Sequence, residues 1–176
     1  MKKFFEDDGW NVYGCDWAWH ALSRASEVSP KNLAYAPIEH LPYEDNFFDS
    51  VVSRRTLHTN PADIRRQAID ECERVLKKGG TFICSVQNLN DKGTLRKYRK
   101  VGIELKDDKN SYAVDVIISG KRNQRMKHFY TKEDITREIE KNKKLKVQSV
   151  SEVTSQAGWC RDDQKYLVVK AKKVVD

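Results

Sequence analysis

Short apolar stretches alternate with helical patterns over residues 1–91, and this alternation predicts βα units around a largely parallel sheet. We expect one helix at 17–27 and another at 61–76, where an apolar stripe recurs at helical spacing. Gly79-Gly80 is expected to end the second helix in a left-handed turn. The strands expected between these helices are Trp10–Cys15, Leu33–Ala36, Phe47–Ser53 and Thr81–Val86.

The second half of the chain predicts more strand than helix. A strand is expected at 113–118, and Thr131-Lys-Glu-Asp134 is a capping signature that opens a helix to about Lys141. Two further strands, 145–153 and 166–171, lie close together in the sequence and are expected to pair as an antiparallel hairpin that closes the sheet. The length of 176 residues suits a single domain over residues 1–176.

Composition excludes several classes of protein. No apolar run approaches the roughly 18 residues that span a bilayer, and the acidic N-terminus lacks the apolar core of a secretory signal. The four cysteines lie far apart without a Cys-x-x-Cys pair, so neither a zinc cage nor a disulfide framework is indicated. The four histidines are equally scattered, so no metal site is expected. Reduced thiols and a cytoplasmic location with no membrane partner are the resulting expectations.

The positive charge is concentrated in one segment. Residues 92–147 carry 17 basic and 8 acidic side chains, whereas residues 1–91 carry 11 and 14. Basic residues interleaved with aromatic ones can hold phosphates and stack on bases, and a solvated lysine-rich surface is the alternative interpretation. The candidates for contacting RNA are Arg96, Lys97, Arg99, Lys100, Lys121, Arg122, Arg125 and Lys127.

Asp16 ends the first predicted strand and directly precedes a predicted helix. Ligands gather at the carboxyl ends of parallel strands, and an acidic residue there can accept hydrogen bonds from both hydroxyls of a ribose. The alternative is that Asp16 only caps the helix. Trp17 beside it can stack on an adenine or simply pack against the protein.

Four stretches of the sequence, taken in order, resemble class I S-adenosylmethionine-dependent methyltransferases. They are WNVYGCDWAWHAL (10–22), LAYAPIEHLPYEDNFFDSVVS (33–53), TLH (56–58) and RVLKKGGTF (74–82). The resemblance implies an α/β fold with a Rossmann-like methyltransferase sheet, mostly parallel with an antiparallel C-terminal hairpin, and S-adenosyl-L-methionine as cofactor. It implies that Asp16 binds the ribose, Trp17 lies against the adenine, Ile38 and Glu39 flank the adenine edge, and Ser53 and Arg54 face the methionine end and the substrate.

The chain departs from this family in two respects. Pro37 stands where the family often has an aspartate, and it removes a backbone donor near the adenine. The glycine-rich loop and the first strand of the family are absent, which leaves a gap between the strands that end at Asp16 and at Ser53. Unpaired interior edges are unstable, so three outcomes are open: the two strands pair directly, another chain supplies the strand, or the sequence is a fragment of a longer reading frame.

The basic segment resembles the substrate-recognition insertion of methyltransferases that modify the wobble uridine of transfer RNA. The insertion would cover about residues 92–130. At its end, the stretch Phe129-Tyr-Thr-Lys-Glu-Asp134 is similar to a late helix start in the family. Arg65-Arg66 also fits that branch. The alternatives are a small-molecule or protein methyltransferase, and a degenerate, non-catalytic module that binds RNA or a partner subunit. His58 can orient a methyl acceptor or merely pack, and no catalytic residue is assigned.

Overall fold

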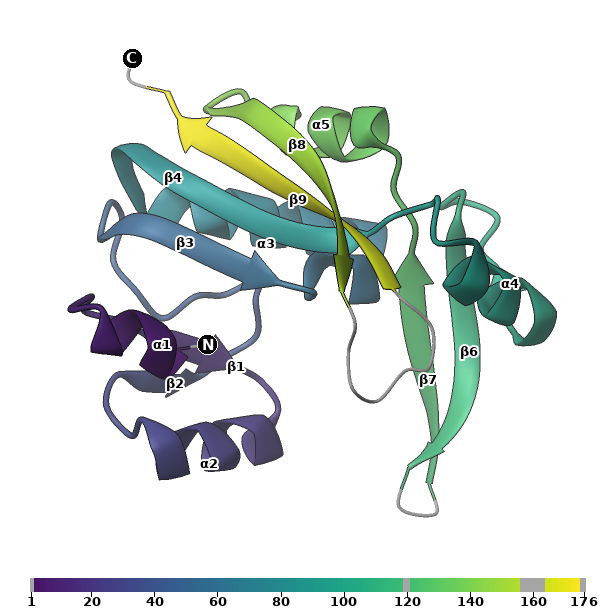
Figure 1. The fold of residues 1–176 in the computed structure, drawn as a ribbon, viewed down its shortest axis with the longest axis horizontal. Helices are drawn as coiled ribbons and strands as arrows, with labels where there is room; N and C mark the ends of the chain where they lie inside the picture. Colours follow the sequence, from purple (N-terminus) through teal and green to yellow (C-terminus); the bar gives the residue numbers. More distant parts are fainter. Residues whose placement is uncertain (1, 119–120, 156–163, 175–176) are drawn as a thin grey trace.

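The computed structural model describes residues 2–118, 121–155 and 164–174. They form three sheets, ordered β1-β2, β3-β4-β9-β8 and β5-β6-β7 (Figure 1). The elements are α1 (Lys2–Asp7), β1 (Gly14–Asp16), α2 (Trp19–Val28), β2 (Leu33–Tyr35), β3 (Phe48–Arg54), η1 (Leu57–Thr59), α3 (Ala62–Val75), β4 (Leu76–Gln87), α4 (Lys92–Val101), β5 (Ile103–Glu104), β6 (Ser111–Ile118), β7 (Lys121–His128), α5 (Lys132–Glu140), β8 (Leu145–Ser155) and β9 (Gln164–Lys173).

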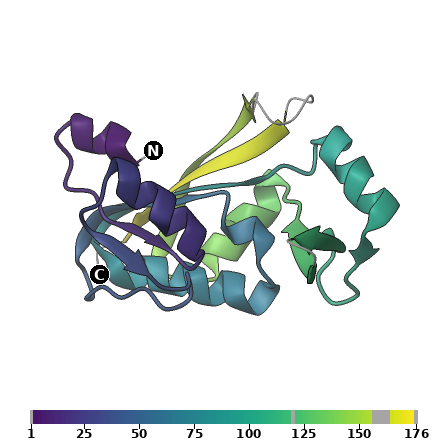
Figure 2. The same ribbon diagram turned by 90° about the horizontal axis from the view of Figure 1, so that it is seen from below.

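The central sheet combines parallel and antiparallel pairs. β3 pairs with β4 in parallel, whereas β9 runs antiparallel to both β4 and β8. The predicted C-terminal hairpin is therefore confirmed, although the segment 158–163 expected to connect its strands lies in the part of the chain that is not described. Helices α3 and α5 cover the same face of this sheet (Figure 2). Their apolar side chains, including Ile69 and Ile135, form one core with Phe82 and Leu167 from the strands.

The end of α3 differs from the prediction that Gly79-Gly80 stops the helix. The helix ends at Val75 and β4 begins at once, so both glycines lie inside the strand, with Gly79 at φ +73°. The register between β3 and β4 shifts at this point. A glycine stop is unnecessary because other groups satisfy the last carbonyls of the helix: the Lys173 ammonium donates to the Glu73 carbonyl at 2.9 Å, and the Phe47 N–H donates to that of Val75.

No strand lies between β1 and β3 within the described residues, as the sequence predicted. Of the three outcomes that the sequence left open, direct pairing of these two strands is wrong, because among the described strands β1 pairs only with β2 and β3 only with β4. A cluster of four rings joins them instead. This aromatic cluster consists of Tyr13, Tyr43, Phe47 and Phe48, with edge-to-face centroid distances of 4.8 to 5.9 Å. Side-chain packing therefore replaces the backbone ladder at this position.

The basic segment contains three elements that the sequence did not predict: helix α4 and strands β5 and β7. The Asp91 side chain caps α4 by accepting a hydrogen bond from the Thr94 N–H at 2.9 Å. Helix α4 packs on β6 through a second small core of Leu95, Tyr112 and Phe129. Residues 92–118 and 121–128 thus form a separate layer at the opposite end of the molecule from β1 and β2 (Figures 1 and 2).

Two general expectations can be compared with the described residues. Cys15, Cys72 and Cys84 carry free thiols there, whereas Cys160 lies outside that part of the chain. Burial raises the pKa of the Cys72 thiol to about 12. Among the described helices, none combines the length and the apolar character needed to cross a bilayer.

Candidate active site

The carboxyl ends of β1 and β3 are brought to the same side by the aromatic cluster. Tyr13 directly precedes β1 and Phe48 is the first residue of β3, and their rings lie 5.4 Å apart. The contact therefore joins the starting ends of both strands, and the opposite ends carry Asp16 and Arg54. In parallel α/β sheets this is the edge where ligands bind.

Asp16 is exposed and lies opposite Tyr35 in the parallel register of β1 and β2. Its Oδ1 accepts a hydrogen bond from the Ala18 N–H at 2.8 Å, just before α2. Its Oδ2 has no hydrogen-bond partner within the described residues. This bond holds the turn before α2, but the N-cap of α2 is Ala18 and carries no side-chain cap hydrogen bond, so Asp16 is not the helix cap and its second oxygen is open to a ligand.

The segment that follows β2 borders Asp16. The Ala36 N–H donates to the Asp16 carbonyl at 3.3 Å, and Pro37, Ile38 and Glu39 follow as half-buried residues. The Ile38 side chain packs against the main core. Trp17 stays 71 % exposed, so it does not pack against the protein and its ring is free to stack on a ligand.

Two exposed aromatic residues next to Asp16 were not predicted. The Tyr35 and Trp19 side chains are 62 % and 68 % exposed, and their rings meet edge to face at 6.3 Å. Tyr35 lies two residues before Pro37 and Trp19 lies two residues after Trp17, and the sequence analysis had named both Pro37 and Trp17. A search for aromatic residues at the ends of predicted strands would have found Tyr35.

Ser53 and Arg54 end β3, and they differ in burial. Ser53 is buried and its Oγ has no hydrogen-bond partner within the described residues, whereas Arg54 is exposed. The next residue, Arg55, adopts φ +58°, a conformation that is uncommon for a residue with a side chain. Its guanidinium lies 4.1 Å from the centroid of the Tyr166 ring. No local sequence pattern predicts this pair, since Tyr166 is more than a hundred positions away from Arg55.

His58 lies on η1, just beyond this strand end, and is buried with its Nδ1 unpartnered among the described residues. Burial, together with the positive charges of Lys127 and Arg55, lowers the pKa of His58 to about 3. The imidazole is therefore neutral at physiological pH. Its burial favours the packed role that the sequence left open for it.

The predicted RNA-binding residues lie in α4 and β7, away from Asp16. Arg96, Lys97, Arg99 and Lys100 are exposed on α4, and Arg125 is exposed on β7. Lys127 reaches back to the carboxyl end of β4, where its Nζ donates to Gln87 Oε1 at 3.1 Å and lies 5.5 Å from the Tyr98 ring centroid. Lys121 and Arg122 belong to β7, but their side chains lie outside the described part of the structure.

Arg65, which together with Arg66 resembles the transfer-RNA branch, is buried and is therefore not available to RNA. It is 2 % exposed and its guanidinium donates to both oxygens of Asp108 at 2.9 and 3.0 Å and to Glu138 Oε1 at 2.9 Å. It therefore ties α3 to α5 and to the loop between β5 and β6.

A cavity of about 340 Å³ lined by residues 88–90, 131–133 and Glu152 contains none of the predicted cofactor residues.

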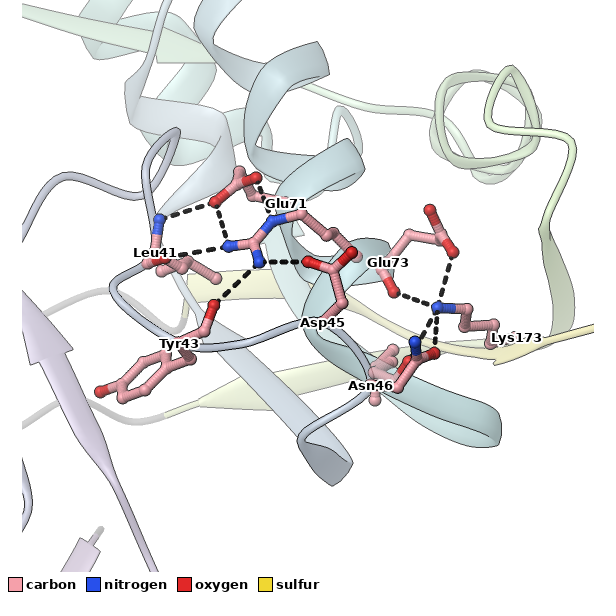
Figure 3. Close-up of polar contacts among 9 residues, drawn as sticks. Leu41, Tyr43, Asp45, Asn46, Glu71, Glu73 and Lys173 are labelled. Atoms are coloured by element: carbon pink, nitrogen blue, oxygen red, sulfur yellow. Dashed lines mark hydrogen bonds and ion pairs between the residues drawn. The ribbon is translucent and has the colours of Figure 1, made fainter.

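The loop between β2 and β3 is fixed to α3 by Arg74. Figure 3 labels its partners Leu41, Tyr43, Asp45 and Glu71. The Arg74 guanidinium donates to the carbonyls of Leu41 and Tyr43 at 2.9 and 2.8 Å and to Asp45 Oδ1 at 2.7 Å. Glu71 completes the network by accepting from Arg74 and from the Leu41 N–H. This loop follows Ile38 and Glu39 directly, so Arg74 also restrains the predicted adenine edge.

Solved structures place this arrangement in a known fold. A S-adenosylmethionine-dependent methyltransferase from Methanosarcina mazei superposes with a TM-score of 0.81 at 16 % identity, over 100 % of this chain and 88 % of that one. This is the fold of S-adenosylmethionine-dependent methyltransferases. Residues 1–84 also match the family model described as a methyltransferase domain. The predicted methyltransferase sheet is thereby confirmed.

Two further structures share the methyltransferase fold. A protein from Pyrococcus horikoshii OT3 has a TM-score of 0.70 at 17 % identity, covering 97 % of this chain and 77 % of that one. The 1,6-didemethyltoxoflavin-N1-methyltransferase of Burkholderia thailandensis, solved with that substrate and S-adenosylhomocysteine, has a TM-score of 0.68 at 18 % identity, covering 98 % and 65 %. No curated protein matches the sequence.

Proposed function

We propose that this chain is a methyltransferase that binds S-adenosylmethionine along the carboxyl ends of β1, β2 and β3. The observation that carries the proposal is the Asp16 carboxylate, which stands at the end of a parallel strand with Oδ2 open. A carboxylate in that position can accept hydrogen bonds from the two hydroxyls of a ribose. Its other oxygen, bonded to the Ala18 N–H, holds the group in place.

The neighbouring residues fit the remaining parts of the cofactor. Trp17 offers an exposed ring to the adenine, and the backbone of Ile38 and Glu39 borders the same side. Ser53 and Arg54 would contact the methionine part from the end of β3, where the buried Ser53 Oγ lacks a partner among the described residues. When bound, S-adenosylmethionine supplies a methyl group on a sulfonium, so the protein mainly has to orient the two reactants.

The test is calorimetric titration of S-adenosylhomocysteine into the wild type and an Asp16→Asn variant. Asparagine keeps the oxygen that accepts from the Ala18 N–H but loses the charge, so stability should hold while affinity falls by about tenfold or more. Asp49→Asn, an exposed aspartate on β3, is the matched control and should bind like the wild type. Equal affinity in the Asp16→Asn variant contradicts the ribose role.

A methyl-transfer assay beside this titration addresses a non-catalytic module, the alternative favoured by the lack of a strand between β1 and β3 in the described chain. A fold that binds S-adenosylhomocysteine and substrate but transfers no methyl group supports that alternative. A partner chain that supplies the strand is a further proposal. Methyl transfer that appears only when a second polypeptide is added would support it.

For the methyl acceptor we propose RNA, with the wobble uridine of transfer RNA as the specific candidate. The support is the basic surface of α4 and β7, whose Lys127 reaches the carboxyl end of β4. A small-molecule acceptor is the second candidate, since the Burkholderia thailandensis enzyme of the same fold was solved with 1,6-didemethyltoxoflavin. Transfer of labelled methyl groups to total transfer RNA and to a small-molecule extract separates the two.

A further inference from the structure

The two halves of the proposed cofactor site are connected by side chains rather than by a sheet. Asp16 belongs to the β1-β2 pair, and Ser53 belongs to the four-stranded sheet. No backbone hydrogen bond joins β1 to β3 within the described residues. Because local opening is easiest where few contacts hold an element, the placement of Asp16 relative to Ser53 depends on those side chains.

The first link runs from α3 to the loop before β3. Arg74 donates two hydrogen bonds to Glu71 at 2.7 and 2.9 Å, which fixes its guanidinium on the helix. The same guanidinium holds the carbonyls of Leu41 and Tyr43 (Figure 3). Its planar fork makes these contacts together, which a lysine ammonium cannot reproduce.

The second link runs from this loop to β1. The Tyr43 ring packs edge to face against Phe48 at 4.9 Å and Tyr13 at 5.9 Å. Its hydroxyl donates to the Gly14 carbonyl at 3.4 Å, two residues before Asp16. Burial raises the pKa of Tyr43 to about 12, so the hydroxyl keeps its proton and acts as a donor at physiological pH.

We propose that Arg74 and Tyr43 are positioning residues that set the placement of the Asp16 end of β1 relative to the end of β3. The role in cofactor binding rests on the proposed function, whereas the mechanical link can be measured without any ligand. Arg74 acts through the loop and Tyr43 acts through Gly14, so neither needs to touch the cofactor.

Hydrogen exchange followed by mass spectrometry on the ligand-free protein tests the link. In Arg74→Lys, amides of β1 and β2 should exchange about three- to tenfold faster, while those of β4 stay as in the wild type. Tyr43→Phe removes only the hydroxyl of a long hydrogen bond, so about a two- to threefold effect is expected. Binding of S-adenosylhomocysteine should weaken by similar factors in each variant.

The chain offers a matched control for each variant. Tyr13→Phe also removes a hydroxyl from the aromatic cluster, but the Tyr13 hydroxyl makes no hydrogen bond within the described residues. Arg137→Lys is the same exchange at a side chain that is 71 % exposed on α5. Both controls should leave the exchange of β1 and β2 unchanged.

Two results would overturn the proposal. One is unchanged exchange of β1 and β2 in both variants, and the other is equal acceleration in β4, which indicates general destabilisation. If exchange responds as expected but the wild type does not bind S-adenosylhomocysteine, the positioning link stands and the proposed function fails.

Discussion

The rings of Tyr13 and Phe48 meet edge to face with centroids 5.4 Å apart, joining the residue before β1 to the first residue of β3. In a continuous sheet, backbone hydrogen bonds between neighbouring strands would hold these elements together. Here the cluster of aromatic rings does so, at the end of the strands opposite Asp16. The attachment of the β1-β2 pair to the rest of the molecule therefore depends on this packing.

We expect Phe48→Ala to lower the free energy of unfolding by about 2 kcal/mol, somewhat less than for a fully buried ring because Phe48 is only half-buried. The loss has two causes: less apolar area is buried, and the edge-to-face contacts with Tyr13, Tyr43 and Phe47 disappear. Urea denaturation followed by circular dichroism measures it. Phe4→Ala, where the ring is 66 % exposed, is the control and should change stability by less than about 0.5 kcal/mol.

The sequence predicted the elements with strong periodicity or caps, and it missed features that depend on distant partners. The Thr131 cap of α5 was found because its signature is local, and the side chain does accept from the Asp134 N–H at 3.1 Å. Lys173 could not be placed, since its ammonium lies 3.1 Å from Asn46 Oδ1 across 127 positions of sequence. Helix α4 was missed because charged residues interrupt its narrow apolar stripe.

In the candidate site, too, the sequence predicted features with a local signal and missed features that depend on distant partners. Asp16 was identified from its place at a strand end, and the structure confirms that place. The contact of Arg55 with Tyr166 depends on the pairing of β9 with β4, which no local pattern reveals. The burial of Arg65 could not be predicted from the local sequence, because basic side chains on a helix usually face solvent. Its acidic partners Asp108 and Glu138 lie in other elements.

Arg65→Met is expected to lower the free energy of unfolding by about 3 to 5 kcal/mol. Removing the guanidinium leaves Asp108 and Glu138 without their cation in a largely buried site. The control is Arg66→Met, an exposed arginine on the same helix, which should be close to neutral. Thermal and urea unfolding measure both variants, and equal effects of the two substitutions would show that the buried network contributes nothing.

Stability should fall as the pH drops from about 6.5 toward about 4. Burial lowers the pKa of His128 to about 4, with the nearby Arg65 adding to the effect, and burial lowers that of His58 to about 3. Between the unfolded and folded values, only the unfolded chain takes up these protons, so it is favoured as the pH falls. Each histidine contributes at most about 1.4 kcal/mol per pH unit.

Urea midpoints between about pH 7 and about pH 5 measure this dependence. In His58→Gln the slope of stability against pH should be smaller than in the wild type, whatever the absolute stability of the variant. His20→Gln changes an exposed histidine and should keep the wild-type slope. An unchanged slope in His58→Gln would mean that this imidazole is not kept neutral by the fold.

If RNA binds to the surface of α4 and β7, its affinity should decrease steeply with salt, because each neutralised phosphate releases counterions. Fluorescence anisotropy with a transfer RNA stem-loop at about 50 and about 200 mM salt measures the slope of log affinity against log salt. Replacing the exposed Arg96, Lys100 and Arg125 by alanine should reduce that slope by about two, since three phosphate contacts are lost.

Alanine at the exposed Lys141, Lys143 and Lys144 removes the same charge elsewhere and should change the slope much less. Equal slopes in the two triple variants would mean that net charge, and not the surface of α4 and β7, accounts for binding.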